Sequence, residues 1–186
     1  MKVAEEAASK ASSIRLVIFD VDGTLTDGKI YMGAQGELMK AFSARDGMGI
    51  TLAHKSGLKT AIITGRSSEI VASRARELKI SAVWQGASDK RSAYEEAKAL
   101  FQVTDAEIAY VGDDLNDLPL LSQAGLACAV GDAMPEVKQL CSLVAENYGG
   151  NGAVRESLEY IIKRQGKWDE AIAAFSAKPA VVDVAQ

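Results

Sequence analysis

The sequence predicts an α/β fold in which a doubly wound, Rossmann-like parallel sheet forms one domain. Short apolar runs rich in β-branched residues alternate with amphipathic helical patterns along the chain. Such runs are typical of strands that are buried on both faces of a parallel sheet. The length of 186 residues suits one domain with a sizeable core. A second domain is therefore not expected.

The elements follow from the local patterns. The apolar runs predict strands, in chain order, over residues 14–19, 58–63, 81–84, 108–111, 126–130 and 143–144. The amphipathic patterns predict helices over residues 47–56, 67–78, 90–101, 118–123, 134–140 and 153–164. This alternation predicts strands joined by helical crossovers.

One segment breaks the alternation. Residues 29–42 contain two short strand-like runs around Gly33 and Gly36, which predicts a β-hairpin projecting from the sheet. The segment 1–13 is rich in Ala, Ser, Glu and Lys and is predicted to be flexible. The domain then covers residues 14–171. A flexible tail is predicted over residues 172–186, which contain Pro179 and have no periodicity.

Composition excludes several classes of protein. The formal net charge of -4 argues against a nucleic-acid binder. Neither a run of about 18 apolar residues nor an apolar leader core is present, so we expect a cytoplasmic protein without a membrane partner. Cys128 and Cys141 lack metal-binding spacing and are predicted to be buried thiols. His54 is the only histidine, which excludes most histidine-based metal sites.

Polar residues follow the predicted strands at the points where the strands end. Asp20 and Asp22 follow the first strand, Thr64 the second, and Asp113 the fourth. In open α/β sheets the carboxyl ends of the strands meet at one rim, where ligands bind. Three carboxylates at one rim repel one another unless a cation joins them. A hard divalent cation with oxygen ligands is expected, and Mg²⁺ fits best beside a phosphate.

Four motifs carry a resemblance. They are Asp20-Val-Asp-Gly-Thr24 after a buried strand, Thr64-Gly-Arg66 after the next strand, Lys90 at the start of a helix, and Gly112-Asp-Asp-Leu-Asn-Asp117. Together and in this order they resemble the motifs of the haloacid dehalogenase-like superfamily. The spacing between the motifs leaves no room for a large cap domain, so a capless member is expected.

The resemblance implies a phosphatase mechanism. Asp20 would be the nucleophile that forms an aspartyl-phosphate, and Asp22 would be the general acid and base. Thr64, Gly65 and Lys90 would bind the phosphate, with Lys90 neutralising its charge. Mg²⁺ would be held by Asp20, Asp113 and the backbone carbonyl of Asp22. The residues expected to act on the metal from outside its ligand set are Asp114, Asn116 and Asp117.

A narrower resemblance covers the chain from about residue 14 to residue 171. The hairpin 29–42 and the segments 45–50, 148–156 and 165–171 resemble the 3-deoxy-D-manno-octulosonate 8-phosphate phosphatases. This implies an eight-carbon sugar acid phosphate as substrate, a role in lipopolysaccharide biosynthesis, and a homotetramer whose neighbouring subunits help to close the site. The substrate carboxylate needs a cation, for which Arg66 is the first candidate and Arg45 and Arg155 are further ones.

Other functions stay open at this point. Phosphatases of nine-carbon nonulosonate 9-phosphates share the four motifs and the capless plan, and Glu69 occurs in a context similar to theirs. A capless protein phosphatase is a further enzyme alternative. A non-enzymatic scaffold with a vestigial site is disfavoured, because Asp20, Asp22 and Asp113 are all intact.

Overall fold

The central sheet has seven strands. The computed structural model describes residues 1–176 and orders the strands β1-β9-β8-β7-β2-β5-β6. Their bounds are β1 Lys2–Val3, β2 Leu16–Phe19, β5 Lys59–Ile63, β6 Ala82–Trp84, β7 Ile108–Gly112, β8 Leu126–Ala129 and β9 Leu143–Val144. All neighbouring strands are parallel except β1, which pairs antiparallel with β9. The predicted doubly wound α/β fold is confirmed.

Strand β2 lies at the centre of the sheet. It pairs with β5 on one side and with β7 on the other, so that Phe19 is level with both Ile62 and Val111. All residues of β2 and β7 are buried, as the apolar runs predict. From β2 the chain first adds β5 and β6 on one side of the sheet and then β7, β8 and β9 on the other side. The residues that follow β2 therefore lie in the crevice at this topological switch point.

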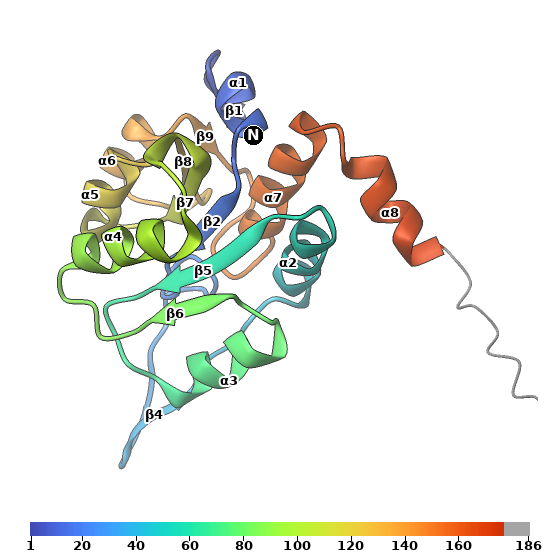
Figure 1. Cartoon of the computed structure of the whole chain (residues 1–186). Helices are drawn as coiled ribbons and strands as arrows, with labels where there is room; N and C mark the ends of the chain where they lie inside the picture. The colour runs from blue at the N-terminus through green and yellow to red at the C-terminus, as the bar shows by residue number, and fades with distance from the viewer. Residues whose placement is uncertain (177–186) are drawn as a thin grey trace, which may run out of the picture.

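Helices cover both faces of the sheet (Figure 1). Their bounds are α1 Ala7–Ser12, α2 Ala44–Lys55, α3 Glu69–Glu77, α4 Lys90–Phe101, α5 Leu118–Leu121, α6 Pro135–Leu140, α7 Ala153–Arg164 and α8 Trp168–Ser176, with short 3₁₀ turns at Asp105–Glu107 and Leu115–Asp117. Helices α2 and α7 pack on one face, and α4, α5 and α6 on the other. At Gly49 in α2 an added Cβ would lie 2.9 Å from the Cα of Arg155, so glycine permits the close approach of α2 and α7.

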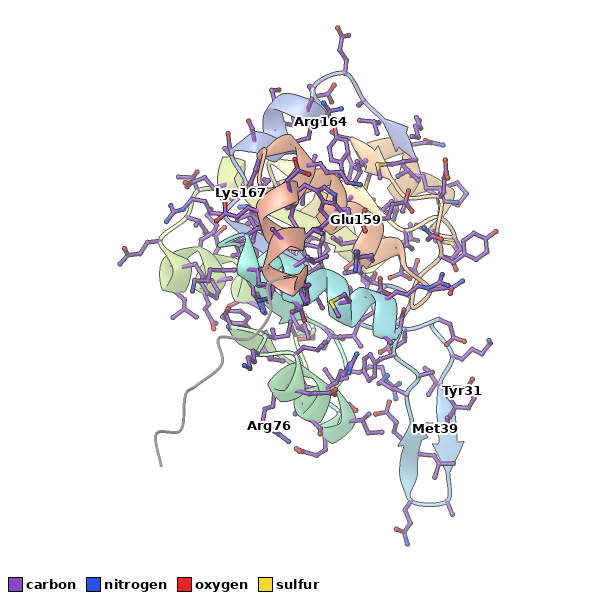
Figure 2. All side chains as sticks on the ribbon, turned by 90° about the vertical axis from the view of Figure 1, so that its right-hand side faces the viewer. Tyr31, Met39, Arg76, Glu159, Arg164 and Lys167 are labelled. Atoms are coloured by element: carbon purple, nitrogen blue, oxygen red, sulfur yellow. The ribbon has the colours of Figure 1, made fainter. Side chains whose placement is uncertain are left out.

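The hairpin is formed by β3 (Tyr31–Gly33) and β4 (Gly36–Met39) and projects from the domain (Figures 1 and 2). Tyr31 pairs with Met39 across the two strands. Large apolar side chains along it are exposed to solvent, namely Ile30, Tyr31, Met32, Leu38 and Met39. An exposed apolar patch of this kind is typical of an interaction surface.

The structure differs from expectation at the N-terminus. The segment 1–13 was expected to be flexible, whereas Lys2 and Val3 pair with Val144 and Leu143 at the sheet edge. Helix α1 follows and buries Ala7 and Ala11 against the core. A two-residue edge strand is too short to show an alternation of apolar and polar residues. It forms only because it pairs with a distant segment of the chain.

The structure also extends the predicted C-terminal boundary. Helix α8 runs to residue 176 and contacts α2 and α7, so it includes the start of the tail predicted over 172–186. Residues 177–186 of that tail lie outside the described residues. Cys128 and Cys141 are buried free thiols, as predicted. Within residues 1–176, the helices are all too short or too polar to cross a membrane.

Candidate active site

The ends of three neighbouring strands deliver the polar residues to one rim of the sheet. Asp20 follows β2, Thr64 follows β5, and Asp113 follows β7. They face a cavity of about 270 Å³. The residues that line it are Asp20, Asp22, Gly28, Thr64, Gly65, Arg66, Asp113, Asp114 and Asn116. The parallel register of the strands thus places residues from distant parts of the chain around one space.

Asp20 and Lys90 form a buried ion pair. The Nζ atom of Lys90 lies 3.0 Å from Oδ1 of Asp20, and both residues are about 95% removed from solvent. Lys90 is the first residue of α4, which Asp89 caps by accepting a hydrogen bond from the backbone N–H of Arg91. The helix start therefore directs the lysine into the rim rather than into solvent.

Asp117 accepts hydrogen bonds at both carboxylate oxygens. Its Oδ1 accepts from Lys90 Nζ and from the Tyr110 hydroxyl, each at 2.7 Å. Its Oδ2 accepts from the backbone N–H groups of Asp113 at 3.0 Å and Asp114 at 3.4 Å. A Cβ at Gly112 would lie 2.5 Å from the same Oδ2, so only glycine fits there. These four bonds fix Asp117 as a support for Lys90 and for the loop after β7.

The carboxylates form a group that suits a cation. Single oxygens of Asp20, Asp113 and Asp117 lie within 4.8 Å of one another. Because donors already occupy both oxygens of Asp117, Asp20 and Asp113 are the better candidates for direct ligands. Thr24 donates a hydrogen bond of 3.0 Å to Oδ1 of Asp113 and orients it. The hard oxygen donors fit Mg²⁺.

The pKa values of the clustered carboxyl groups also indicate that this site favours a bound cation. Burial, together with the neighbouring Asp117 carboxylate, raises the pKa of Asp20 to about 6. Burial, together with the Asp20 carboxylate, raises the pKa of Asp113 to about 7. Both groups would ionise more readily with a divalent cation between them.

Asp22 lies at the mouth of the cavity within a network of charged residues. Its Oδ2 is 3.8 Å from Nε of Arg66, and its Oδ1 accepts a hydrogen bond from Lys40. Glu37 pairs with the same two cations and accepts a hydrogen bond from Ser68. The sequence does not single out Lys40, Glu37 or Ser68 as site residues. A lysine and a glutamate in a hairpin have the pattern of ordinary solvent-exposed residues.

A glycine loop supports the segment that follows β2. The backbone N–H of Gly150 donates to the carbonyl of Thr24 at 2.9 Å, and an added Cβ at Gly149 would lie 1.7 Å from the carbonyl oxygen of Gly23. Asp132 accepts a hydrogen bond of 2.9 Å from the backbone N–H of Gly149. The absence of side chains at Gly149 and Gly150 lets them pack directly against the backbone of residues 23–27, which follow Asp20 and Asp22.

The structure leaves two predicted substrate-binding residues outside the cavity. Arg45 is exposed in the first turn of α2. Arg155 forms an ion pair with Glu159, and its guanidinium lies 5.9 Å from the ring centroid of Trp168. Neither lines the cavity of its own chain, because the packing of α2 and α7 holds both away from the rim.

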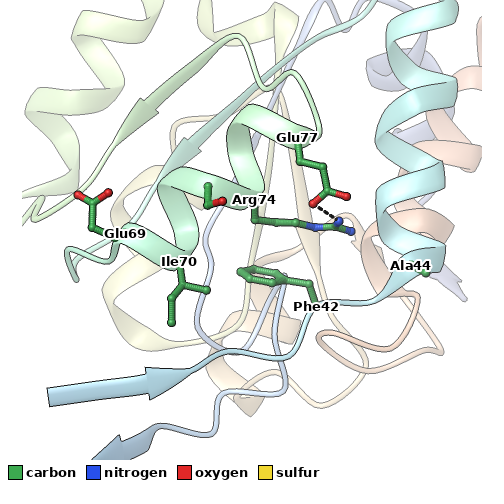
Figure 3. A pocket seen from close by; sticks show the side chains of 7 residues that line it. Phe42, Ala44, Glu69, Ile70, Arg74 and Glu77 are labelled. Carbon is green, nitrogen blue, oxygen red and sulfur yellow. Dashed lines mark hydrogen bonds and ion pairs between the residues drawn. The ribbon is translucent and has the colours of Figure 1, made fainter. Parts of the chain in front are cut away.

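A larger hollow of about 630 Å³ lies over α3 (Figure 3). Phe42, Ile70 and the ion pair between Arg74 and Glu77 line it, together with Glu69 at the start of the helix. It shares no lining residue with the cavity at Asp20. Glu69 therefore belongs to this hollow and does not line the candidate active site.

Comparisons with known proteins find relatives over most of the chain. Residues 79–156 match the model of a family described as haloacid dehalogenase-like hydrolase. The chain is 46% identical to the 3-deoxy-D-manno-octulosonate 8-phosphate phosphatase of Yersinia pestis, with 91% of this chain and 90% of that protein covered. It is 44% identical, with the same coverage, to the phosphatase of the same name in Escherichia coli strain K12.

Solved structures are similar throughout the domain. The phosphatase of the same name from Moraxella catarrhalis, solved in complex with magnesium, phosphate and 3-deoxy-D-manno-octulosonate (KDO), has a TM-score of 0.88 and 40% identity, covering 91% of this chain and 98% of that one. The Yersinia pestis enzyme has a TM-score of 0.87, covering 90% of both chains. The chain thus belongs to the 3-deoxy-D-manno-octulosonate 8-phosphate phosphatase family of haloacid dehalogenase-like hydrolases.

Proposed function

We propose that the chain is a phosphatase that hydrolyses 3-deoxy-D-manno-octulosonate 8-phosphate to 3-deoxy-D-manno-octulosonate and inorganic phosphate. The observation that carries this proposal is the identity of 44–46% with phosphatases of that name over 91% of the chain. The cluster of Asp20, Lys90 and Asp113 at the rim of the sheet supplies the chemistry that such a reaction needs. The product would serve lipopolysaccharide biosynthesis.

The first step transfers the phosphoryl group to the protein. A carboxylate oxygen of Asp20 attacks phosphorus, and the bond between phosphorus and the sugar oxygen breaks. Asp22 donates its proton to the leaving sugar oxygen, so the sugar departs as an alcohol. Lys90 and Thr64 stabilise the negative charge on the phosphoryl group during its transfer.

The second step returns Asp20 to its starting state. Asp22, now a carboxylate, takes a proton from a water molecule that attacks the phosphorus of the aspartyl-phosphate. Inorganic phosphate leaves, and the Asp20 carboxylate is regenerated. Asp117 has no role at the reacting atoms in this scheme; it positions Lys90 through the 2.7 Å hydrogen bond.

The cofactor is Mg²⁺. Asp20, Asp113 and the backbone carbonyl of Asp22 would hold it, and Asp114, Asn116 and Asp117 would act on it from outside this ligand set. When bound, the ion neutralises charge on the phosphate and on the clustered carboxylates. The raised pKa values of Asp20 and Asp113 support the need for such an ion.

Substrate recognition would use Arg66 and a neighbouring subunit. Arg66 lines the cavity with its guanidinium half-exposed, where it can pair with the substrate carboxylate. The cavity of about 270 Å³ is smaller than the 300 to 1,000 Å³ that is usual for small-molecule sites. Walls from another subunit would complete it, and Arg45 or Arg155 of that subunit would be available to the substrate.

The proposed assembly is a homotetramer in the cytoplasm. The exposed apolar side chains of the hairpin, among them Met32 and Leu38, support self-association through this element. Burying them between subunits would remove apolar surface from water. Size-exclusion chromatography with light scattering tests the assembly, and a monomer at working concentration would contradict it.

The alternative functions are not favoured. The relatives from Yersinia pestis and Escherichia coli are named for the eight-carbon substrate, and Glu69 lies outside the cavity. Intact Asp20, Asp22, Thr64, Lys90 and Asp113 argue against a scaffold with a vestigial site.

Phosphate release tests the proposal. A panel of the eight-carbon and nine-carbon sugar acid phosphates and hexose phosphates is assayed with Mg²⁺ and with excess chelator. The proposal expects a strong preference for the eight-carbon substrate and no turnover with chelator. Preference for the nine-carbon substrate would contradict the substrate assignment, and absence of all turnover would contradict the enzyme assignment.

A further inference from the structure

Lys40 occupies an unusual place for a hairpin lysine. It follows β4, where the hairpin returns to the domain, and Figure 2 places its neighbour Met39 on this strand. Only 1% of the Lys40 side chain is exposed. Its Nζ donates to Oδ1 of Asp22 and lies 3.0 Å from Oε1 of Glu37. The ammonium group therefore joins the hairpin to the residue proposed as the general acid.

Another lysine of the same hairpin provides a contrast. The Lys29 side chain is 70% exposed and pairs with the exposed Asp27 at 2.7 Å. An exposed pair of this kind contributes little, whereas a buried ammonium group is costly unless it is paired and hydrogen-bonded. Burial alone would lower the pKa of Lys40, but the hydrogen bonds to Asp22 and Glu37 outweigh burial and hold that pKa above its ordinary value. Lys40 thus stays charged beside Asp22.

The network holds Asp22 from two sides. Lys40 contacts Oδ1, while Nε of Arg66 lies 3.8 Å from Oδ2. Glu37 in turn contacts both cations and accepts a hydrogen bond from Ser68, the residue that caps α3. Asp22 itself is 20% exposed, so without these partners its side chain would be free to adopt other rotamers.

We propose that Lys40 is a positioning residue that holds the Asp22 carboxyl group in the orientation needed to deliver a proton to the leaving sugar oxygen. This inference rests on the proposed phosphatase function. The residue acts through Asp22 and not at the phosphorus. The hairpin then has a role in the reaction of its own chain, because its return strand carries the group that orients the acid.

The dependence of the rate on the leaving group distinguishes this role from a merely structural one. A sugar alkoxide is a poor leaving group and needs a proton, whereas p-nitrophenolate leaves well without one. Misplacing the acid therefore slows alkyl phosphates far more than aryl phosphates. A general loss of structure would slow both substrates alike.

The experiment measures kcat and KM for the eight-carbon sugar acid phosphate and for p-nitrophenyl phosphate, with Mg²⁺, in the full chain. The variants are Lys40→Met, Asp22→Asn, the double variant, and Lys29→Met as the matched control on the same hairpin. For Lys40→Met we expect kcat for the sugar acid phosphate to fall about 10- to 100-fold, with a much smaller fall for the aryl substrate. The double variant should be no slower than Asp22→Asn, and Lys29→Met should match the wild type.

Equal losses on the two substrates, or a further loss on adding Lys40→Met to Asp22→Asn, would overturn the proposal. If Lys40→Met does not fold, Lys40→Arg keeps the positive charge and is expected to retain the wild-type ratio of the two rates; a ratio as low as that of Asp22→Asn would contradict the role. Failure of the proposed function is distinguishable, because the wild type itself would then not turn over the sugar acid phosphate.

Discussion

Asp20 and Lys90 form an ion pair of 3.0 Å that is almost completely buried, and Lys90 also contacts Asp117 at 2.7 Å. Removing the single cation leaves two buried carboxylates without a positive charge between them, although Asp117 keeps its hydrogen bonds from Tyr110 and from the loop after β7. We therefore expect Lys90→Met to destabilise the metal-free protein by about 3–5 kcal/mol. Chemical denaturation measures this.

Lys98 is the matched control for Lys90. It lies on the same helix, α4, and pairs with Glu95 and Asp105 at the surface. Lys98→Met should cost less than about 1 kcal/mol. Similar losses in the free energy of unfolding for the two variants would show that the buried pair of Asp20 and Lys90 contributes no more to stability than a surface pair.

The second prediction concerns Mg²⁺ and pH. The pKa values of Asp20 and Asp113 are raised to about 6 and about 7 from the ordinary 3.8. Between pH 3.8 and about 7 these two carboxyl groups bind more protons in the folded metal-free protein than in the unfolded chain, so their contribution to stability falls as the pH rises through this window. Mg²⁺ binding requires the ionised carboxylates. The gain in Tm on adding Mg²⁺ should thus be larger at about pH 8 than at about pH 5.

Asp113→Asn provides the control for this effect. It removes one charge from the cluster, so the metal-free variant should be more stable than the wild type at about pH 8, and Mg²⁺ should raise its Tm less. Thermal melting with and without Mg²⁺ measures both effects. A gain in Tm that is the same at the two pH values would contradict this account of the carboxylates.

The third prediction concerns Arg66. If Arg66 pairs with the substrate carboxylate, Arg66→Ala should raise KM for the eight-carbon substrate about 10- to 100-fold, the equivalent of one charged hydrogen-bonding group. KM for p-nitrophenyl phosphate, which lacks a carboxylate, should change much less. Steady-state kinetics on both substrates measures this, and equal changes would remove Arg66 from recognition.

The fourth prediction concerns the close packing of Gly149 against the backbone of Gly23. A methyl group there would meet the carbonyl oxygen of Gly23, so Gly149→Ala must displace the loop that holds Asp20 and Asp22. We expect a loss of about 1–3 kcal/mol in stability together with a lower kcat. At Gly57 an added Cβ meets nothing within 4 Å, although its φ is +84°. Gly57→Ala should thus cost about 1 kcal/mol in stability while leaving kcat unchanged.

The sequence predicts much of this structure because its signals are local. Each buried strand is a short apolar run, and Asp20, Thr64 and Asp113 follow strands whose ends must meet in a parallel sheet. The roles of Lys40 and Glu37 could not be predicted, because only the return of the hairpin against Asp22 buries them. Strand β1 could not be predicted for a similar reason, because it forms by pairing with β9, which is distant in the sequence.

Asp20-dependent hydrolysis of the eight-carbon sugar acid phosphate is the central claim. The most direct test compares phosphate release from this substrate by the wild type and by Asp20→Asn, with Mg²⁺, after thermal melting has established that both are folded. We expect rapid release by the wild type and a loss of more than about 10⁴-fold in the variant. Comparable turnover by a folded Asp20→Asn protein would contradict the assignment of the nucleophile and the mechanism built on it.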